Sequence, residues 1–409
     1  MSLYEFGQKI RKAIQGNYCN LIDTFVTFAL PEDPRYSKKQ TIHLFSTTGI
    51  RHSYPTTVAR HMRMAGHDHQ TGETALGRIN PLNSEQLFED MKRSNDVIIG
   101  KAVDREEFHG TLIVALDTHD VYRHSKIPMD EKRKRECSDI RTVMGTKPKD
   151  DSCYAHKYMT VQNIKRDDEP PYVLACDRVL PLQNKTEIAR TILKETEFKT
   201  HAAIELVIAD GGFDDIDTLI MLRDEEKHFV VRADQDKRVK KSIEEIEKEG
   251  KKYHVEYDYR KGNKKRGVTA NLVVIDVEWL KKQGIKYPLK KKGWMSFYTD
   301  LYPEKDESLR RFCLRIALYY KKRWGIETGY RCINDFTGKT HSLSDAARLF
   351  FYLQAILLYN LWIQINRQFK DDPGRKKYFR NGIPTSTIKF VMEELIRDRL
   401  EEWGKSSEV

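Results

Sequence analysis

The stretches TLIVALD at 111–117 and IELVIAD at 204–210 determine the fold that this sequence predicts. Each is a short apolar run with the length of a buried β-strand, and each ends in an aspartate. The stretch KTEIARTILKETEFK at 185–199 precedes the second run, and its apolar residues fall on one face of a helix. We therefore expect a crossover helix to lead into the second strand.

The neighbouring segments extend this pattern in both directions. The runs at 152–164 and 171–179 are rich in Tyr and Val and predict a hairpin, because a turn-like KRDDEP separates them. The stretch 214–227 predicts a second helix and 228–233 a further strand. Three antiparallel strands followed by α, β, α and β is the order of the ribonuclease H-like fold. We therefore expect the fold class α/β, with a ribonuclease H-like mixed sheet flanked by helices.

The rest of the chain divides by its pattern of helical and extended runs. A charged helix and three extended runs after residue 233 predict a β-rich insertion, and helical patches before residue 106 predict a helical N-terminal region. The expected segments are a helical region at 1–105 for DNA binding or dimerisation, the first part of the core at 106–233, the insertion at 234–303, C-terminal helices of the core at 304–369 and a tail at 370–409. The region at 1–105 could equally be a solvated helical cap.

Two tips of the expected insertion are strongly basic, RKGNKKR at 260–266 and LKKKGW at 289–294. Clustered Lys and Arg beside Trp294 could follow a phosphate backbone and stack on a base. The alternative is a solvated hairpin with a half-buried tryptophan.

The overall composition favours a polyanionic partner and gives no sign of a membrane protein. The 409 residues include 72 Lys and Arg against 61 Asp and Glu, a net charge of +11. The mean hydropathy is −0.67. The most apolar stretch, 349–365, contains Gln354, Asn360 and Gln364 and is short for a membrane span, so it predicts a buried helix.

The six cysteines form no CxxC pair, which argues against a zinc module and a disulfide framework. The N-terminus carries charges throughout and lacks the apolar core of a signal peptide. We therefore expect a reducing, cytoplasmic compartment.

The two aspartates that end the apolar runs are the first candidates for chemistry. If the two strands are parallel neighbours, Asp117 and Asp210 emerge at the same edge of the sheet, where α/β sheets bind ligands. An aspartate at a strand end is also a common turn or helix-capping residue. His119 and Asp120 follow closely and could add a ligand or a proton shuttle, or form a hydrogen-bonded loop.

Glu327 is the third candidate. Tyr320, Arg323, Glu327, Arg331 and Asn334 are spaced three or four residues apart and would share one face of a continuous helix. Gly325 and Gly329 weaken such a helix. The alternative is a surface ion pair between Arg323 and Glu327.

Three carboxylates that converge on one place need positive charge to offset their own. We expect no neighbouring residue to neutralise all three, which points to a divalent metal ion. Oxygen ligands suit Mg²⁺ or Mn²⁺. Two such ions at Asp117, Asp210 and Glu327 would support in-line phosphodiester transfer without an organic cofactor.

The stretch YKKRWGIETGYRCIN at 320–334 resembles the Tyr-x2-Arg-x3-Glu-x6-Lys signature of cut-and-paste DDE transposases from bacterial and archaeal insertion sequences. Tyr320, Arg323 and Glu327 match, whereas Asn334 stands at the lysine position and Lys339 lies five residues further on. LIVALDTHD and LVIADGGFDD resemble the strands that carry the family's two catalytic aspartates, and the resemblance covers roughly 108 to 365.

This resemblance implies that Asp117, Asp210 and Glu327 are the catalytic and metal-binding residues, with two Mg²⁺ or Mn²⁺ ions per site. It implies DNA contacts by Tyr320 and Arg323, and we add Arg331, Lys339 and Trp294 as candidate DNA-binding residues. Trp324 is expected to pack in the core. The expected partners are transposon-end and target DNA and a second copy in a homodimer, at the nucleoid, with no membrane and no small-molecule cofactor.

Three other functions remain open at this point. The same site could serve a ribonuclease H-like nuclease or resolvase that only hydrolyses DNA. The chain could be a captured transposase that only binds DNA, a reading that Asn334 leaves open. Paired carboxylates also serve glycosidases, but that chemistry explains neither the basic charge nor the Arg and Glu helix.

Overall fold

The structure is a computed structural model that describes residues 1–26, 35–65, 70–122, 144–149, 152–164, 170–262, 266–285, 293–342 and 344–406. Most of the turn expected at 165–170 and parts of both basic tips lie outside these residues.

The strands are β1 Leu112–Tyr122, β2 Met144–Lys149, β3 Ser152–Asn163, β4 Val173–Val179, β5 Ile204–Ala209, β6 His228–Arg232, β7 Tyr253–Gly262, β8 Gly267–Asp276 and β9 Trp294–Thr299. The helices before the sheet are α1 Leu3–Val26, α2 Lys38–Ile50, α3 Pro55–Met64, α4 Gly72–Ile79 and α5 Ser84–Asp104.

The remaining helices lie between and after the strands. They are α7 Lys185–Thr200, the short 3₁₀ helix η2 Gly211–Phe213, α8 Ile216–Asp224, α9 Lys237–Lys248, α10 Val277–Lys282, α11 Leu309–Lys322, α12 Trp324–Phe336, α13 Asp345–Gln368, α14 Pro373–Tyr378 and α15 Thr385–Ser406. The helical N-terminal region that the sequence predicts is therefore confirmed.

All nine described strands form one mixed sheet, in the order β2-β3-β1-β5-β6-β9-β8-β7, with β4 also paired to β3. Strands β1, β5 and β6 are parallel to one another, and β3 and β4 form the antiparallel hairpin. Helix α7 joins β4 to β5, as a crossover connection requires. This confirms the fold class and the strand order expected from the sequence.

Strand β1 is longer than the apolar run that predicts it. Its parallel pairing with β5 stops at Leu116 and Ala209, but its antiparallel pairing with β3 continues from Asp117 to Tyr122. The expectation that Asp117 ends a strand is therefore wrong. The reason is that β3 is a 12-residue strand, and its backbone keeps hydrogen-bonding β1 after β5 has ended.

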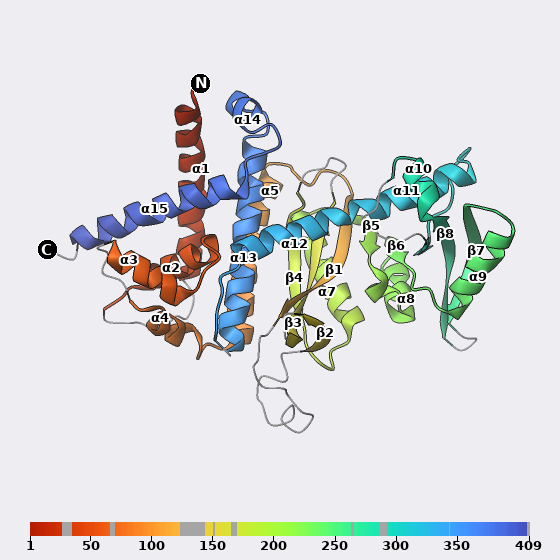
Figure 1. Ribbon diagram of the computed structural model, residues 1–409, viewed down its shortest axis with the longest axis horizontal. Coiled ribbons are helices and arrows are strands. Elements are labelled where there is room, and N and C mark those ends of the chain that lie inside the picture. The colour runs from red at the N-terminus through yellow and green to blue at the C-terminus, as the bar shows by residue number, and fades with distance from the viewer. Residues whose placement is uncertain are drawn as a thin grey trace.

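The β-rich segment continues the same sheet. Strand β9 pairs antiparallel with β6, and β8 and β7 follow in turn. Strand β7 is the last strand on this path, and its pairing shifts register between Glu256 and Tyr259. Asp258 lies in this bulge with a positive φ of 53°. The sheet therefore runs from the ribonuclease H-like strands to this bulged edge, at the end of the molecule drawn at the right of Figure 1.

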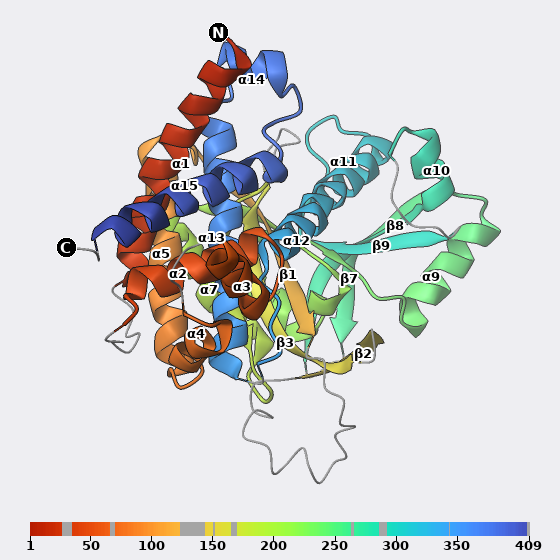
Figure 2. The same cartoon turned by 60° about the vertical axis from the view of Figure 1, so that its left-hand side comes forward.

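Helix α13 forms the centre of the helical part. Every residue from Ala346 to Ile365 is buried, which confirms the buried helix expected from the sequence. The helix is long and apolar enough to cross a membrane, but its apolar window is fully inside the protein, which is typical of a core helix. Figures 1 and 2 show α13 between the N-terminal helices on one side and the sheet on the other, with α15 crossing α1.

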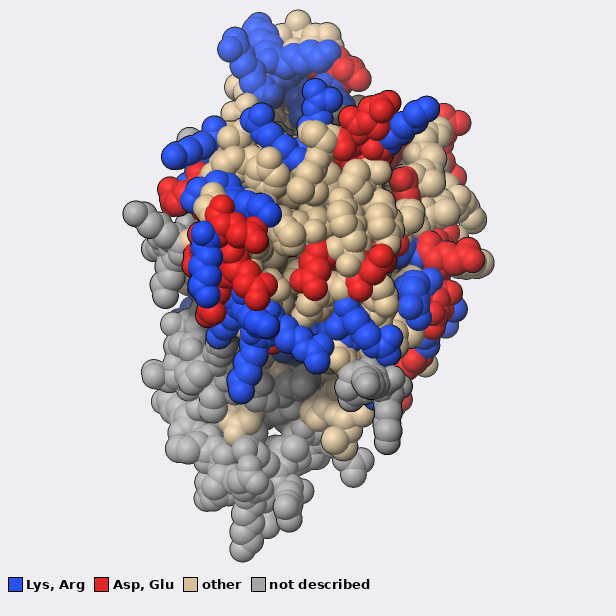
Figure 3. Space-filling view, turned by 90° about the vertical axis from the view of Figure 1, so that its right-hand side faces the viewer, with Lys and Arg blue, Asp and Glu red and all other residues tan. Residues whose placement is uncertain are grey.

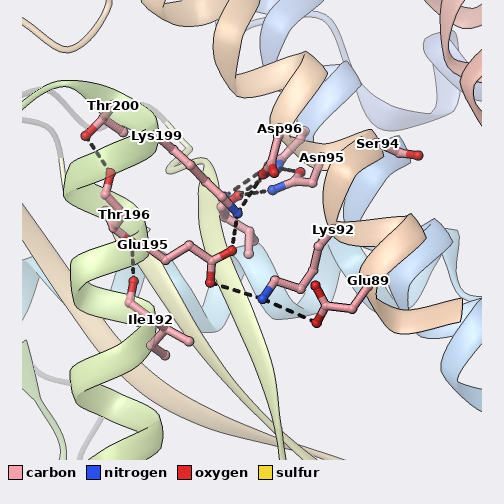
Figure 4. Close-up of polar contacts among 12 residues, drawn as sticks. Glu89, Lys92, Ser94, Asn95, Asp96, Ile192, Glu195, Thr196, Lys199 and Thr200 are labelled. Atoms are coloured by element: carbon pink, nitrogen blue, oxygen red, sulfur yellow. Dashed lines mark hydrogen bonds and ion pairs between the residues drawn. The ribbon is translucent and has the colours of Figure 1, made fainter. Parts of the chain in front are cut away.

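Charged side chains join the N-terminal region to the core where α5 packs against α7 (Figure 4). The ammonium of Lys199 lies 2.6 Å from an Asp96 carboxylate oxygen and 2.5 Å from one of Glu195. Glu195 also pairs with Lys92 at 3.2 Å. Burial raises the pKa of Asp96, and the nearby Lys199 opposes this rise. Because these charged groups have lost much of their hydration, each depends on the opposite charge of its partner to offset that cost.

Replacing Lys199 by Ala should lower the free energy of unfolding by about 2 kcal/mol, because it removes the cation paired with Asp96 and one of the two paired with Glu195. Lys194→Ala on the same helix is the matched control, since Lys194 is 58% exposed and pairs with Glu225 at the surface. That change should cost less than about 0.5 kcal/mol. Urea unfolding measures both, and equal losses would contradict the assignment.

Candidate active site

Asp117 lies in the sheet beside the end of β5 and is 6% exposed. Its Oδ1 accepts a hydrogen bond from the backbone N–H of Thr118 at 2.8 Å. Its Oδ2 accepts one from Nη1 of Arg323, also at 2.8 Å. The hydrogen bond from the Arg323 guanidinium offsets the loss of water around this buried carboxylate, and the two bonds together hold its side chain in one orientation.

Asp210 follows β5 directly. Leu116 of β1 is paired with Ala209 of β5, so Asp117 and Asp210 follow paired residues on neighbouring parallel strands. Oδ1 of Asp210 caps η2, because it accepts a hydrogen bond from the N–H of Gly212 at 2.9 Å. A Cβ at Gly211 would lie 2.7 Å from Oδ1 of Asp234, so a larger residue there would displace the Asp234 side chain. The sheet edge predicted from the sequence therefore carries both aspartates.

Glu327 comes from the first turn of α12. The helix through this motif, whose continuity Gly325 and Gly329 left open, is interrupted at one residue. Helix α11 ends at Lys322 and α12 begins at Trp324, while Arg323 keeps right-handed helical dihedrals of φ −53° and ψ −27°. Arg323 forms the junction, where its N–H bonds to the carbonyl of Tyr320 in a tight turn. Tyr320 and Glu327 are therefore on different helices, and Arg323 sits where the chain changes from one to the other.

Arg323 connects the helix to the sheet. Its Nη1 binds Asp117, and its Nη2 donates to Oε1 of Glu327 at 3.2 Å. Arg323 is 7% exposed, whereas the Glu327 side chain is 52% exposed. The surface ion pair considered for Arg323 and Glu327 is thus one half of a bridge that reaches into the sheet. The sequence predicts that no neighbouring residue neutralises all three carboxylates, and Arg323 contacts two of them, Asp117 and Glu327. The i,i+4 spacing reveals only the Glu327 contact.

The three carboxylates influence one another. Burial raises the pKa of Asp117 to about 7, Arg323 opposes this rise, and the negative charges of Asp210 and Glu327 add to it. Among the described residues, however, no group of three or more His, Cys, Asp or Glu side chains is close enough to hold a metal ion. The donor set, three carboxylates, suits a hard divalent cation, while the guanidinium supplies the positive charge between Asp117 and Glu327.

Lys185 is a further cation at this edge that the sequence analysis missed. It is the first residue of α7, and its ammonium donates a hydrogen bond to the carbonyl of Gly212. The ammonium also lies 3.5 Å from the centre of the Phe213 ring. Burial lowers the pKa of Lys185, and the nearby Asp210 and Asp215 oppose this shift. No local pattern could have identified it, because 25 positions separate it from Asp210 in the sequence.

The residues proposed to bind DNA lie in different surroundings. Tyr320 is 1% exposed and packs against Phe297, with ring centres 5.0 Å apart. Trp294 is half-buried, and its indole N–H donates to Glu247 at 2.6 Å. Arg331 and Lys339 are exposed. Of these side chains, only the last two therefore present their charge to solvent.

The residues after Asp117 form part of the sheet. His119 belongs to β1, so the loop considered for it is wrong; its ring stacks on Tyr330 at 4.5 Å. Asp120 pairs with Lys157 at 3.5 Å. The hydroxyl of Tyr330 hydrogen-bonds Thr160 at 2.6 Å, which packs α12 against β3. Trp324 is half-buried and packs on the apolar cluster around Tyr320, in agreement with its expected role.

The geometry is that of two aspartates on neighbouring parallel strands facing a glutamate on a helix. A family model described as the transposase DDE domain matches residues 109–361. The chain therefore belongs to the transposase DDE domain family. A cryo-EM structure of a piggyBac transposase synaptic complex with hairpin DNA has a similar fold, with a TM-score of 0.53 and 13% identity over 96% of this chain and 79% of that chain. No curated protein matches the sequence significantly.

The raised pKa of Asp117 predicts how metal binding depends on pH. Below about 7 this carboxyl is mainly protonated, and a metal ion must displace its proton. The affinity for Mn²⁺ should therefore rise by up to about tenfold per pH unit below that pKa and level off above it. Titration calorimetry with Mn²⁺ between pH 5.5 and 8.5 tests this.

Asp224→Asn is the control, because it removes an exposed carboxylate outside the site. It should keep the pH dependence of the native chain. A flat affinity across pH 6 to 8 in the native chain would contradict the prediction.

Proposed function

We propose that this protein is a cut-and-paste DNA transposase of a bacterial or archaeal insertion sequence, which cleaves the element's ends and transfers them into target DNA. The observation that supports this most is the pairing of Leu116 with Ala209, which sets Asp117 and Asp210 side by side. Arg323 then connects the Glu327 helix to the same edge. Family membership provides independent support.

In this proposal Asp117, Asp210 and Glu327 are the catalytic residues and hold two Mg²⁺ or Mn²⁺ ions. Such ions, when bound, activate the attacking oxygen and stabilise the leaving oxygen of the phosphodiester. Arg323 and Lys185 place two cationic side chains beside the carboxylates. Cations in that position would orient a DNA phosphate and offset the charge that develops during transfer.

We further propose that Tyr320, Arg323, Arg331, Lys339 and Trp294 form the DNA-binding set. The exposure of Arg331 and Lys339 supports a direct role for these two. Lys339 lies shortly after α12, and its backbone is tied to the N-terminal region, because its N–H bonds to the carbonyl of Ser53 at 2.8 Å. It could therefore serve in place of the lysine missing at Asn334. The active species would be a homodimer in the cytoplasm, at the nucleoid.

Cleavage of labelled DNA that carries the element's ends tests the function. The native chain should cut the ends in Mg²⁺ or Mn²⁺ and join them to target DNA. Glu327→Gln should slow cleavage more than ~100-fold while it keeps DNA binding, because a metal ligand is lost. Asp224→Asn should leave cleavage unchanged, since its carboxylate lies outside the site.

The products also separate the alternatives. Cleavage without any joined product would favour a nuclease or resolvase. DNA binding without cleavage by either chain would favour a captured, DNA-binding transposase and would overturn the proposed function.

A further inference from the structure

A cavity of about 430 Å³ lies between α8, α9 and the β7–β8 hairpin. The residues that line it are Ile216, Asp236, Lys237, Arg238, Tyr259, Lys261 and Gly262. None of them belongs to the carboxylate site, and three of the seven carry a cation.

The walls of the cavity are fixed by specific contacts. Arg238 donates to the carbonyl oxygen of Gly262 at 3.2 Å, which ties α9 to the hairpin. Lys261 pairs with Asp214 at 2.9 Å, and its ammonium lies 4.5 Å from the centre of the Tyr298 ring. Gly262 has a φ of +105°, and a Cβ there would lie 2.4 Å from the carbonyl oxygen of Arg266. The paired ends of β7 and β8 at Gly262 and Gly267 therefore lie beside the cavity.

The charge of the lining favours an anion. Asp236 is the single acidic residue among the lining residues. Its Oδ1 already accepts the N–H groups of Arg238 and Val239, each at 2.9 Å, as the cap of α9. Asp214 pairs with Lys261, and one oxygen of Asp236 is engaged by the helix, so the three cations still exceed the two carboxylates by one. Lys237 is exposed, so its ammonium can reach a ligand.

The cavity borders the edge of the sheet that carries Asp210. Ile216 follows the turn after β5, and Asp236, Lys237 and Arg238 follow β6, the next parallel strand. Asp214, the partner of Lys261, also accepts the N–H of Asp234 at 2.9 Å. The loops after both strands are therefore bound to each other and to the hairpin. Figure 3 shows this end of the molecule, where Lys and Arg gather in a band below a broad uncharged area.

We propose that this cavity binds a backbone phosphate of duplex DNA that lies along the catalytic edge of the sheet. This inference rests on the proposed function, because it assigns a further contact to the same substrate. The loops after β5 and β6 lie at the edge of the sheet that carries Asp210, and the cavity places cations beside them for a polyanion bound at that edge. Contacts of this kind position the duplex without reading its sequence.

The dependence of duplex binding on salt tests the proposal in the full-length chain, with EDTA present to prevent cleavage. Lys237→Gln should weaken binding several-fold at low salt and reduce the slope of log affinity against log salt by about 1, because one phosphate contact is lost. The loss should be the same for duplexes of unrelated sequence. Lys237→Arg should restore the native slope.

Lys248→Gln is the matched control, because it removes one positive charge from the other end of α9. It should keep the native slope. A native slope in Lys237→Gln, or equal reductions in Lys237→Gln and Lys248→Gln, would overturn the proposal. Failure of the proposed function is distinguishable, because it shows as absent cleavage by the native chain in metal, whatever the salt dependence of binding.

Discussion

The burial of α13 is the constraint on which the arrangement of the molecule depends. A helix that exposes no side chain from Ala346 to Ile365 must be covered on every side. The sheet alone cannot do this, so α1, α2, α4 and α5 cover it from the N-terminal region, and α12 covers it from the C-terminal part. Some polar groups on the helix find partners inside the protein; Asn360, for example, donates to the carbonyl of Val173 at 2.8 Å and to Asn95. The N-terminal helices are thus part of the core on which the candidate site is built.

This packing also determines where Glu327 lies. Helix α12 packs on α13 and, through Tyr330 and Thr160, on β3. Its first turn therefore comes to the edge of the sheet where Asp117 and Asp210 are held. Arg323 occupies the junction and compensates two of the three carboxylates. Any metal ion bound by these residues has to compete with, or displace, a guanidinium that already satisfies Asp117.

Local sequence patterns were sufficient for the sheet edge and for the buried helix, because both depend on apolar runs. Two parallel strands that each lead into an aspartate predict one shared edge, and the structure has it. The length of β1 was not predictable from its own residues, because THDVY remains extended through its pairing with β3. The i,i+4 spacing of Arg323 and Glu327 revealed their contact but not the bond to Asp117, which lies 206 residues away. Lys185 was missed for the same reason, since burial and long-range proximity leave no local pattern.

The bulge in β7 has a consequence for how copies of this chain meet. A nine-stranded sheet that ended in a regular strand would present an uninterrupted row of backbone N–H and C=O groups to any neighbour. The register shift around Asp258 breaks that row within the last strand. A second molecule therefore finds no long ladder to extend along β7, which disfavours edge-to-edge pairing of two sheets at this strand.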